Sequence, residues 1–214
     1  MKTESQRRPT LRAPRPHQDA RAPTHDERVL LHGVSWEQYR AISDALGDGV
    51  HARLTYLEGV LEIMSPGDAH ERKKSRIGAL VELYALERGI ELEAYGQTTF
   101  RKRTQERGLE PDECYVFGRS LRGRKRPDLA IEVEETRPAL RKLEVYRGLA
   151  VPEVWLWRGG RLSVHALVGE TYETREASAF LPGLDLALVA SLVRSSRSLT
   201  AVLRALRARV RGEE

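Results

Sequence analysis

The middle of this sequence holds two short apolar segments, each opened by a Pro-Asp step. A segment with helical periodicity and a further apolar segment follow them. The Pro-Asp steps begin residues 111–117 and residues 127–133, and both segments have the composition of short, buried β-strands. Residues 138–149 begin with a proline and have helical periodicity, and residues 154–157 form another strand. Strands that alternate with helices in this way predict an α/β or α+β domain with one central mixed sheet.

The segments on either side have the same mixed character. Ser35 and Gln38 form a capping box, which predicts a short amphipathic helix over residues 36–46. The other expected elements are a β-hairpin of residues 54–57 and 60–64 around Glu58-Gly59, a helix from a capping box at Asp68 and Glu71 to Gly89, strands near 90–95 and 97–102 with a polar loop after them, a strand over 162–167, and one or two amphipathic helices after Pro182-Gly183.

The chain of 214 residues is long enough for one domain with a buried core. Residues 1–28 are rich in proline and charge and poor in large aliphatic side chains, which predicts a disordered basic arm, either a passive tail or an accessory phosphate-binding arm. The expected folded domain is 29–195. Residues 196–214 are expected to form a C-terminal amphipathic helix. The leucines after Pro182-Gly183, from Leu184 to Leu206, serve either as intramolecular core or as a surface for a partner.

Composition excludes several classes of protein. The single cysteine, Cys114, cannot form an internal disulfide or a thiolate zinc site, so it is expected to be a small buried hydrophobe. None of the six histidines are paired at i, i+4 spacing, so any metal must be held mostly by oxygen. No apolar run reaches the ~20 residues of a membrane helix, and a secretory signal is absent, so we expect a cytoplasmic protein without a membrane partner. The net charge of +5 permits nucleic acid as a partner and equally fits a solvated, arginine-rich surface.

Carboxylates cluster on and beside the second Pro-Asp strand. Glu132 and Glu134 lie on one side of it, ~6.6 Å apart, so in a cleft they need a cation nearby, whereas on a half-exposed strand both simply face solvent. Asp128 is ~13 Å from Glu132 along the strand and is expected to shape the turn. Asp112 opens a separate strand and is free to sit beside Glu132. Together with the Val133 carbonyl, these two acids can offer hard oxygen ligands to Mg²⁺.

The next helix carries a lysine that could complete such a site. Lys142 and Tyr146 are four residues apart and therefore lie on one helix face. A lysine directed at the cleft can orient an attacking water or stabilise transition-state charge, whereas an isolated helix lysine is usually solvated. Trp155 and Trp157 face one side of the following strand, where we expect them to pack beneath this helix; a stacking platform for bases is the alternative.

Five motifs in a fixed order carry a resemblance to a known family: Leu61 to Pro66 with His70-Glu71, Glu110 to Tyr115, Pro127 to Val133, Lys142 to Arg147, and Val151 to Trp157. Over roughly residues 29–195 the sequence resembles the Uma-two family of proposed restriction endonucleases, in the PD-(D/E)XK nuclease superfamily. The resemblance implies a restriction-endonuclease-like core, in which helices flank a central mixed sheet and a Mg²⁺-dependent phosphodiesterase site lies at the sheet edge.

The resemblance also implies roles for individual residues. Asp112 matches the family's aspartate, and Glu132 matches the acid of the second half of the motif. Glu134 stands where the superfamily has its lysine, and Lys142 matches the lysine that this family carries on the following helix. This places Asp112, Glu132, Lys142 and Glu134 in the expected catalytic group.

Two further acids match acidic positions of the family. Glu62 and Glu71 could hold a second ion or hydrogen-bond a ligand, and with Tyr146 they are the accessory candidates; strand-surface and capping roles are the alternatives for the two acids. The basic residues expected to hold a nucleic-acid backbone, which equally fit solvated loops, are Arg101, Lys102, Arg103, Arg122, Arg124, Lys125 and Arg126.

The function expected from these features is Mg²⁺-dependent endonucleolytic hydrolysis of DNA, with Mn²⁺ able to replace Mg²⁺. Asp112 and Glu132 would hold the ion, and Lys142 would position the attacking water. The alternative is a nuclease-like module that binds nucleic acid or a partner without cleaving, with Glu134 marking the lost chemistry. Because cutting both strands of a duplex is simplest for a two-fold dimer, a homodimer is expected.

Overall fold

The computed structural model describes residues 24–47, 52–96, 98–118, 126–135 and 140–213. In chain order the elements are β1 (Glu27–His32), α1 (Trp36–Leu46), β2 (Arg53–Leu57), β3 (Val60–Ser65), α2 (Asp68–Arg88), β4 (Leu92–Ala94), β5 (Phe100–Lys102), the 3₁₀ turn η2 (Arg103–Gln105), β6 (Arg107–Leu109), β7 (Glu113–Phe117), β8 (Leu129–Glu134), α3 (Lys142–Leu149), β9 (Glu153–Arg158), β10 (Arg161–Val168), β11 (Thr171–Arg175), α4 (Leu186–Arg194) and α5 (Leu199–Arg211).

These strands form two sheets. One is antiparallel with the order β1-β3-β2-β6-β5, and the other has the order β11-β10-β9-β8-β7-β4. The second sheet is mixed because β8 and β9 run parallel, and α3 lies in the connection between them. The predicted fold class, a restriction-endonuclease-like α+β core with a mixed sheet and flanking helices, is confirmed. The separate antiparallel sheet was not part of the prediction, because the sequence pattern of a hairpin does not show which sheet the hairpin joins.

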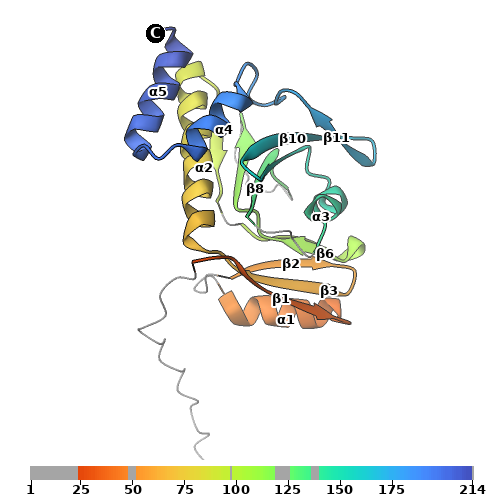
Figure 1. Ribbon diagram of the computed structural model, residues 1–214. Helices are drawn as coiled ribbons and strands as arrows, with labels where there is room; N and C mark the ends of the chain where they lie inside the picture. Colours follow the sequence, from red (N-terminus) through yellow and green to blue (C-terminus); the bar gives the residue numbers. More distant parts are fainter. Residues whose placement is uncertain (1–23, 48–51, 97, 119–125, 136–139, 214) are drawn as a thin grey trace, which may run out of the picture.

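Helices cover both faces of the mixed sheet. The long α2 runs along one side of the molecule from the antiparallel sheet to α4 and α5, which pack beside its far end (Figure 1). Ile77, Leu80 and Tyr84 of α2 share a core with Ile131 of β8 on this face. On the opposite face α3 packs through its buried apolar side chains, among them Val145. Helix α3 also contacts β2, β5 and β6, so it lies between the two sheets.

The two aromatic side chains of β9 lie on the face opposite to the predicted one. Trp155 and Trp157 are buried in the core beneath α2 and α4, whereas Val154 and Leu156 face α3. The prediction that the tryptophans pack beneath the Lys142 helix is therefore wrong. Alternation along a strand shows which residues share a face, but it does not show which of two apolar faces each helix covers.

The helix and turn signals gave mixed results. The capping box of Ser35 and Gln38 starts α1 as predicted, and the turn between β2 and β3 has positive φ at Glu58 and Gly59. The capping box predicted at Asp68 and Glu71 is wrong. Gly67 caps α2 without a side-chain hydrogen bond, while the Glu71 carboxylate pairs with Arg53 and Lys74.

Three segments differ from the predicted elements. Residues 107–109 form β6 within the predicted polar loop, and residues 171–175 add β11 as an unpredicted edge strand. Helix α3 begins at Lys142, later than the predicted start; Pro138 lies outside the described residues. Both added strands are at most five residues long, too short for a clear periodicity, so hydrogen bonding to a neighbouring strand defines them.

Both ends of the described chain join the fold. Residues 24–28, which the prediction assigned to the arm, include the start of β1 and two side chains that contact the rest of the protein. At the other end, Val202 and Leu206 of α5 are buried in the core that α2 shares with the mixed sheet. Helix α5 therefore packs as part of this core. Within the described ranges, none of the helices is both long and apolar enough to cross a bilayer.

Candidate active site

The candidate site is built on the face of β8 that is turned toward α3. Along β8, Leu129, Ile131 and Val133 belong to the core beneath α2, whereas Ala130 belongs to the core beneath α3. Because side chains alternate along a strand, Glu132 also points toward α3, and it is fully buried. A carboxylate at such a position requires partners that satisfy its charge.

Helix α3 supplies those partners. Lys142 Nζ donates to one carboxylate oxygen of Glu132, and the Tyr146 hydroxyl donates to the other. The two donors are one helical turn apart on α3, so both reach the same acid, as their spacing indicated. Burial raises the pKa of Glu132, and the Lys142 ammonium only partly offsets this. Burial alone would lower the pKa of Lys142, but Glu132 and Asp112 outweigh burial and raise it, so Lys142 stays charged.

Strand pairing brings Asp112 next to Glu132. In the antiparallel pair β7–β8, Glu113 lies opposite Ile131, so the residue before Glu113 comes beside the residue after Ile131. Asp112 is fully buried, and its Oδ2 accepts a hydrogen bond of 2.8 Å from the backbone N–H of Val133. Glu132 on β8 and Asp112, the residue before β7, therefore lie beside each other, as the sequence predicted.

Two cationic side chains hold the other oxygen of Asp112. His70 Nε2, in the first turn of α2, lies 3.0 Å from Asp112 Oδ1, and Arg53 Nε on β2 lies 3.5 Å from it. Burial by itself raises the pKa of Asp112, but His70, Lys142 and the Val133 N–H outweigh it and lower the pKa below its usual range. Asp112 is therefore ionised at neutral pH.

His70 and the residues before β1 were missed by sequence reasoning. His70 is fully buried, and its Nδ1 lies 3.4 Å from Asp26 Oδ2, so it bridges two carboxylates. Burial lowers the pKa of His70, but hydrogen bonds and charge from Asp112 and Asp26 raise it overall to about 9. Asp26 Oδ1 also accepts from the Gly67 N–H that opens α2. His70 stands within a family-like motif, which was a usable signal; Asp26 lies in a segment whose composition indicates disorder and offered none.

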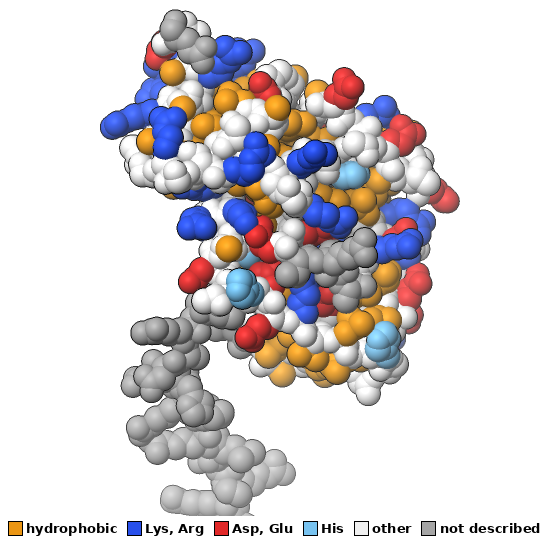
Figure 2. Space-filling model, viewed as in Figure 1, with side chains coloured by type: hydrophobic (Ala, Val, Ile, Leu, Met, Phe, Trp, Pro, Cys, Tyr) orange, Lys and Arg blue, Asp and Glu red, His pale blue; other side chains and the backbone are white. Residues whose placement is uncertain are grey.

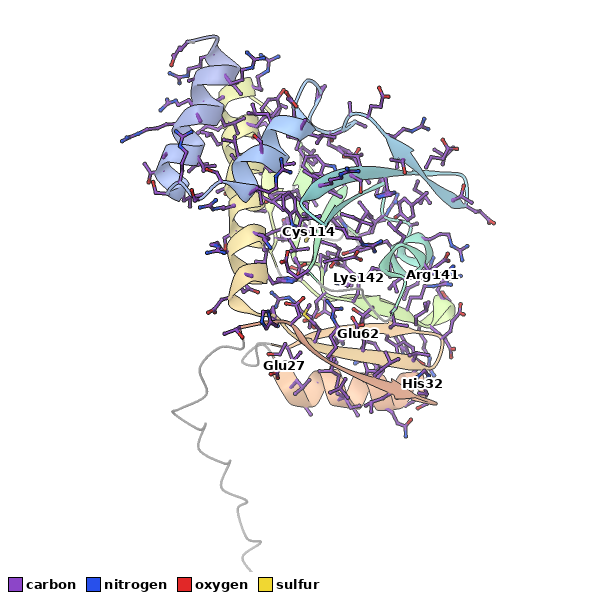
Figure 3. All side chains as sticks on the ribbon, viewed as in Figure 1. Glu27, His32, Glu62, Cys114, Arg141 and Lys142 are labelled. Atoms are coloured by element: carbon purple, nitrogen blue, oxygen red, sulfur yellow. The ribbon has the colours of Figure 1, made fainter. Side chains whose placement is uncertain are left out.

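A second group of charges surrounds these residues. Arg53 Nη2 also pairs with Glu71 at 3.1 Å, and Lys74 Nζ pairs with Glu71 at 2.9 Å. Glu62 on β3 is buried and pairs with Arg28 at 3.1 Å. The pKa of Lys142 is raised in part by Glu62, so this acid faces the site across from α3 (Figure 3). Both accessory acids thus lie around the predicted site, and Arg53 and Lys74 are additional members that the sequence did not indicate.

Glu134 is also buried, but it has a different partner. In the parallel pair β8–β9 it lies opposite Arg158, and the Arg158 guanidinium pairs with its carboxylate. The expectation that the two acids of β8 need a nearby cation is met by two separate residues, Lys142 for Glu132 and Arg158 for Glu134. Glu134 is therefore a buried acid that is already paired on the protein.

The oxygen atoms at the site fit a hard divalent cation by their chemistry. Carboxylates of Asp112 and Glu132 and the carbonyl of Val133 are ligands of the kind that Mg²⁺ prefers. All four carboxylate oxygens accept hydrogen bonds or ion pairs from protein donors, so an ion has to replace some of these contacts. Within the described ranges, no group of three or more His, Cys, Asp or Glu side chains gathers as a metal site.

The basic residues expected to hold a nucleic-acid backbone make several internal contacts. Arg101 pairs with Asp44 and stacks on the Tyr39 ring, and Lys102 Nζ donates to a backbone carbonyl of α3. Arg103 is exposed and pairs with Glu37. Arg126 is half-buried, whereas Arg122, Arg124 and Lys125 lie outside the described residues.

Two predictions about neighbouring residues are confirmed. Asp128 Oδ2 accepts a 3.0 Å hydrogen bond from the Phe117 N–H, so this acid fixes the connection between β7 and β8, as predicted. Cys114 is buried in the core beneath α3, and burial raises the pKa of its thiol to about 12, which fits the prediction of a small hydrophobe.

The mixed sheet with flanking helices is a restriction-endonuclease-like α+β core, and it carries one buried acid on β8, a second buried acid just before β7, and a lysine bonded to the first. The model of the Uma2 (Uma-two) family, whose description reads "Putative restriction endonuclease", matches residues 36–201. The chain therefore belongs to the Uma2 family, as the five motifs indicated. No match was found among curated proteins.

Proposed function

We propose that this protein is a divalent-metal-dependent endonuclease that hydrolyses phosphodiester bonds in DNA. The observation that carries the proposal is the convergence of Asp112, Glu132 and Lys142: the two acids are fully buried side by side, and Lys142 contacts one of them. The description of the family, which is that of a nuclease, supports the same reaction.

Asp112, Glu132 and the Val133 carbonyl would hold the ion. A bound Mg²⁺ or Mn²⁺ neutralises phosphate charge and makes a coordinated water more acidic. In the reaction the water oxygen forms a bond to phosphorus and gives up a proton to solvent, the bond from phosphorus to the leaving oxygen breaks, and the leaving oxygen takes a proton from solvent.

The protein's own groups position the reactants. Lys142 is charged, so it acts as a hydrogen-bond donor to the attacking water or to a phosphate oxygen and not as a base. Tyr146 fixes the Glu132 carboxylate, and His70 and Arg53 keep Asp112 ionised and in place. We assign Glu134 to the structural pair with Arg158, because an anion cannot take over the donor role of a lysine.

A non-cleaving module is the second candidate. It is favoured by the internal donors on every carboxylate oxygen of Asp112 and Glu132 and by Glu134 at the superfamily lysine position. Such a module would bind nucleic acid with or without an intact acid pair.

Nicking of supercoiled plasmid distinguishes the two functions. The purified protein with Mg²⁺ or Mn²⁺ should convert the plasmid to open circles, and EDTA should stop the conversion. Asp112→Asn and Glu132→Gln should lose nicking while they still bind DNA. The matched control is Asp128→Asn. Asp128 belongs to the second Pro-Asp step, on the connection between β7 and β8, and this variant should retain nicking. Equal nicking by wild type and both acid variants would indicate a contaminant and remove the proposal.

We also propose that the active form is a homodimer, because a duplex has two strands to cut. Support comes from β1, which lies at one end of the antiparallel sheet and exposes Val29, Leu30 and Leu31. Such an edge is suited to pairing with a second copy. Light scattering should give a dimer for the wild type and a monomer for Leu30→Lys; a monomeric wild type at micromolar concentration would contradict this proposal.

A further inference from the structure

A cleft of about 350 Å³ lies between α2 and the connection from α4 to α5, outside the acid site. We call it the basic cleft; its lining consists of Arg72, Lys73, Arg76, Val193, Arg194, Ser195 and Ser196. Four of these seven side chains are cationic, none is acidic, and two carry hydroxyl groups. From this composition we infer that the basic cleft binds a backbone phosphate of the nucleic-acid strand that enters the acid site.

The charge of the cleft is only partly neutralised. Arg72 and Arg194 are exposed, and neither has a carboxylate within ion-pair distance among the described residues; the Arg194 guanidinium donates to the carbonyl of Gly160. Arg76 donates to backbone carbonyls at the end of α4, including Val193 at 3.3 Å, so it holds the wall of the cleft in place. A phosphodiester supplies the anionic oxygens that these guanidinium groups bind well.

The basic cleft adjoins the acid site through a single ion pair. Lys73 lines the cleft and pairs with Glu135. Glu135 in turn lines a small cavity of about 100 Å³, together with Asp26 and His70 of the acid site. The two hollows are therefore neighbours on either side of this pair. On the face in Figure 2, acidic side chains gather near the middle of the molecule, with Lys and Arg side chains beside them.

The spacing along α2 fits a strand better than a free anion. His70 and Arg76 are six residues apart, which is about 9 Å along a helix axis. One strand of B-DNA advances about 3.4 Å per nucleotide, so the two positions are about two to three nucleotides apart. A ligand that carries phosphates at regular intervals can occupy the cleft and the acid site at once, whereas inorganic phosphate can fill only one. This inference rests on the proposed function, because the strand bound in the cleft is the one to be cut.

The test measures DNA binding without cleavage. Fluorescence anisotropy of a labelled duplex is recorded in EDTA over a series of KCl concentrations, for wild type and for Arg72→Gln/Arg194→Gln. Loss of the phosphate contact in the cleft should weaken binding to unrelated sequences alike and reduce the slope of log K against log salt by about 0.9. Arg88→Gln/Arg40→Gln is the matched control: it removes two exposed arginines at the far end of α2 and on α1, and its slope should equal that of wild type. Equal melting temperatures exclude misfolding as the cause.

Three results would overturn the inference. The first is an unchanged slope in the cleft variant, and the second is the same loss of slope in the cleft and control variants. The third is displacement of the duplex from wild type by inorganic phosphate beyond the effect of chloride at equal ionic strength, which would indicate a free-anion site. The plasmid assay separates this inference from the proposed function. If the wild type nicks plasmid and the cleft variant binds DNA with an unchanged salt slope, the inference about the cleft is wrong and the endonuclease proposal stands. If DNA binding depends on the cleft but the wild type does not nick plasmid, the endonuclease proposal is wrong and the inference about the cleft stands.

Discussion

Removing the ammonium group of Lys142 should destabilise the fold, and a second substitution should reverse this effect. In Lys142→Met the carboxylate of Glu132 stays buried but loses its cation. In Lys142→Met/Glu132→Gln both charges are gone, and the Tyr146 hydroxyl can still donate to the amide oxygen. Stability should therefore return in the double variant, while nuclease activity should be absent from both.

The magnitude follows from the burial of the pair. Glu132 is 0% exposed and Lys142 is 4% exposed, so solvent screens the charges very little. Breaking a buried pair by removing one partner costs about 3–5 kcal/mol. For a chain of this size that corresponds to a decrease of about 6–20 °C in melting temperature. The pKa of the unpaired carboxylate is higher in the folded state than in the unfolded state. At low pH the carboxyl group is protonated in both states, so the variant loses little stability from it. At high pH the group is ionised, and burying this charge without a cation makes the loss of stability larger.

Urea unfolding in EDTA, followed by circular dichroism at two pH values, measures these differences. The single variant should lose stability most at the higher pH, and the double variant should lose less than half as much. If Lys142→Met costs under about 1 kcal/mol, the pair behaves like a solvated surface pair and the buried arrangement is refuted. The same holds if the double variant is as unstable as the single one.

Three further predictions concern other charged and titratable residues of the described chain. Asp26→Asn should lower the His70 pKa from about 9, because one of the two carboxylates that stabilise the imidazolium is lost; an unchanged imidazole titration by NMR would contradict this. Arg158→Met should reduce stability by about 1 kcal/mol, a value discounted for the exposure of this arginine, and adding Glu134→Gln should restore it without loss of nicking. Burial lowers the pKa of His165, so its contribution to stability is present above pH 6.5 and is lost as the pH falls below it; His165→Gln should flatten that part of the stability curve, and an unaltered slope would contradict this.

Much of the site was predictable because its residues lie on regular elements. Alternation along β8 placed Glu132, and the four-residue spacing on α3 placed Lys142 and Tyr146 on one face. The Pro-Asp step freed Asp112 to approach from the adjacent strand. For these residues local periodicity and short connections determine the geometry.

The rest depended on contacts between distant segments. Asp26 lies in a proline-rich, charged segment, and composition cannot reveal that it accepts a hydrogen bond from the N–H of Gly67. The sequence shows Arg53 only as a residue of a strand. Its contact with Asp112 depends on the packing of β2 beside that acid. The face of β9 that carries its tryptophans was misassigned because both faces of the mixed sheet are apolar and buried. Long-range packing decides such features.

A crystal structure of the wild type soaked in Mn²⁺, with anomalous data at the manganese edge, tests whether the acid pair is a metal site. One anomalous peak should lie about 2.1 Å from an oxygen of both Asp112 and Glu132, and the peak should disappear in Asp112→Asn. If nicking by the protein in solution depends on Mn²⁺ but the crystals show no peak between these acids, the assignment of Asp112 and Glu132 as the metal ligands is contradicted.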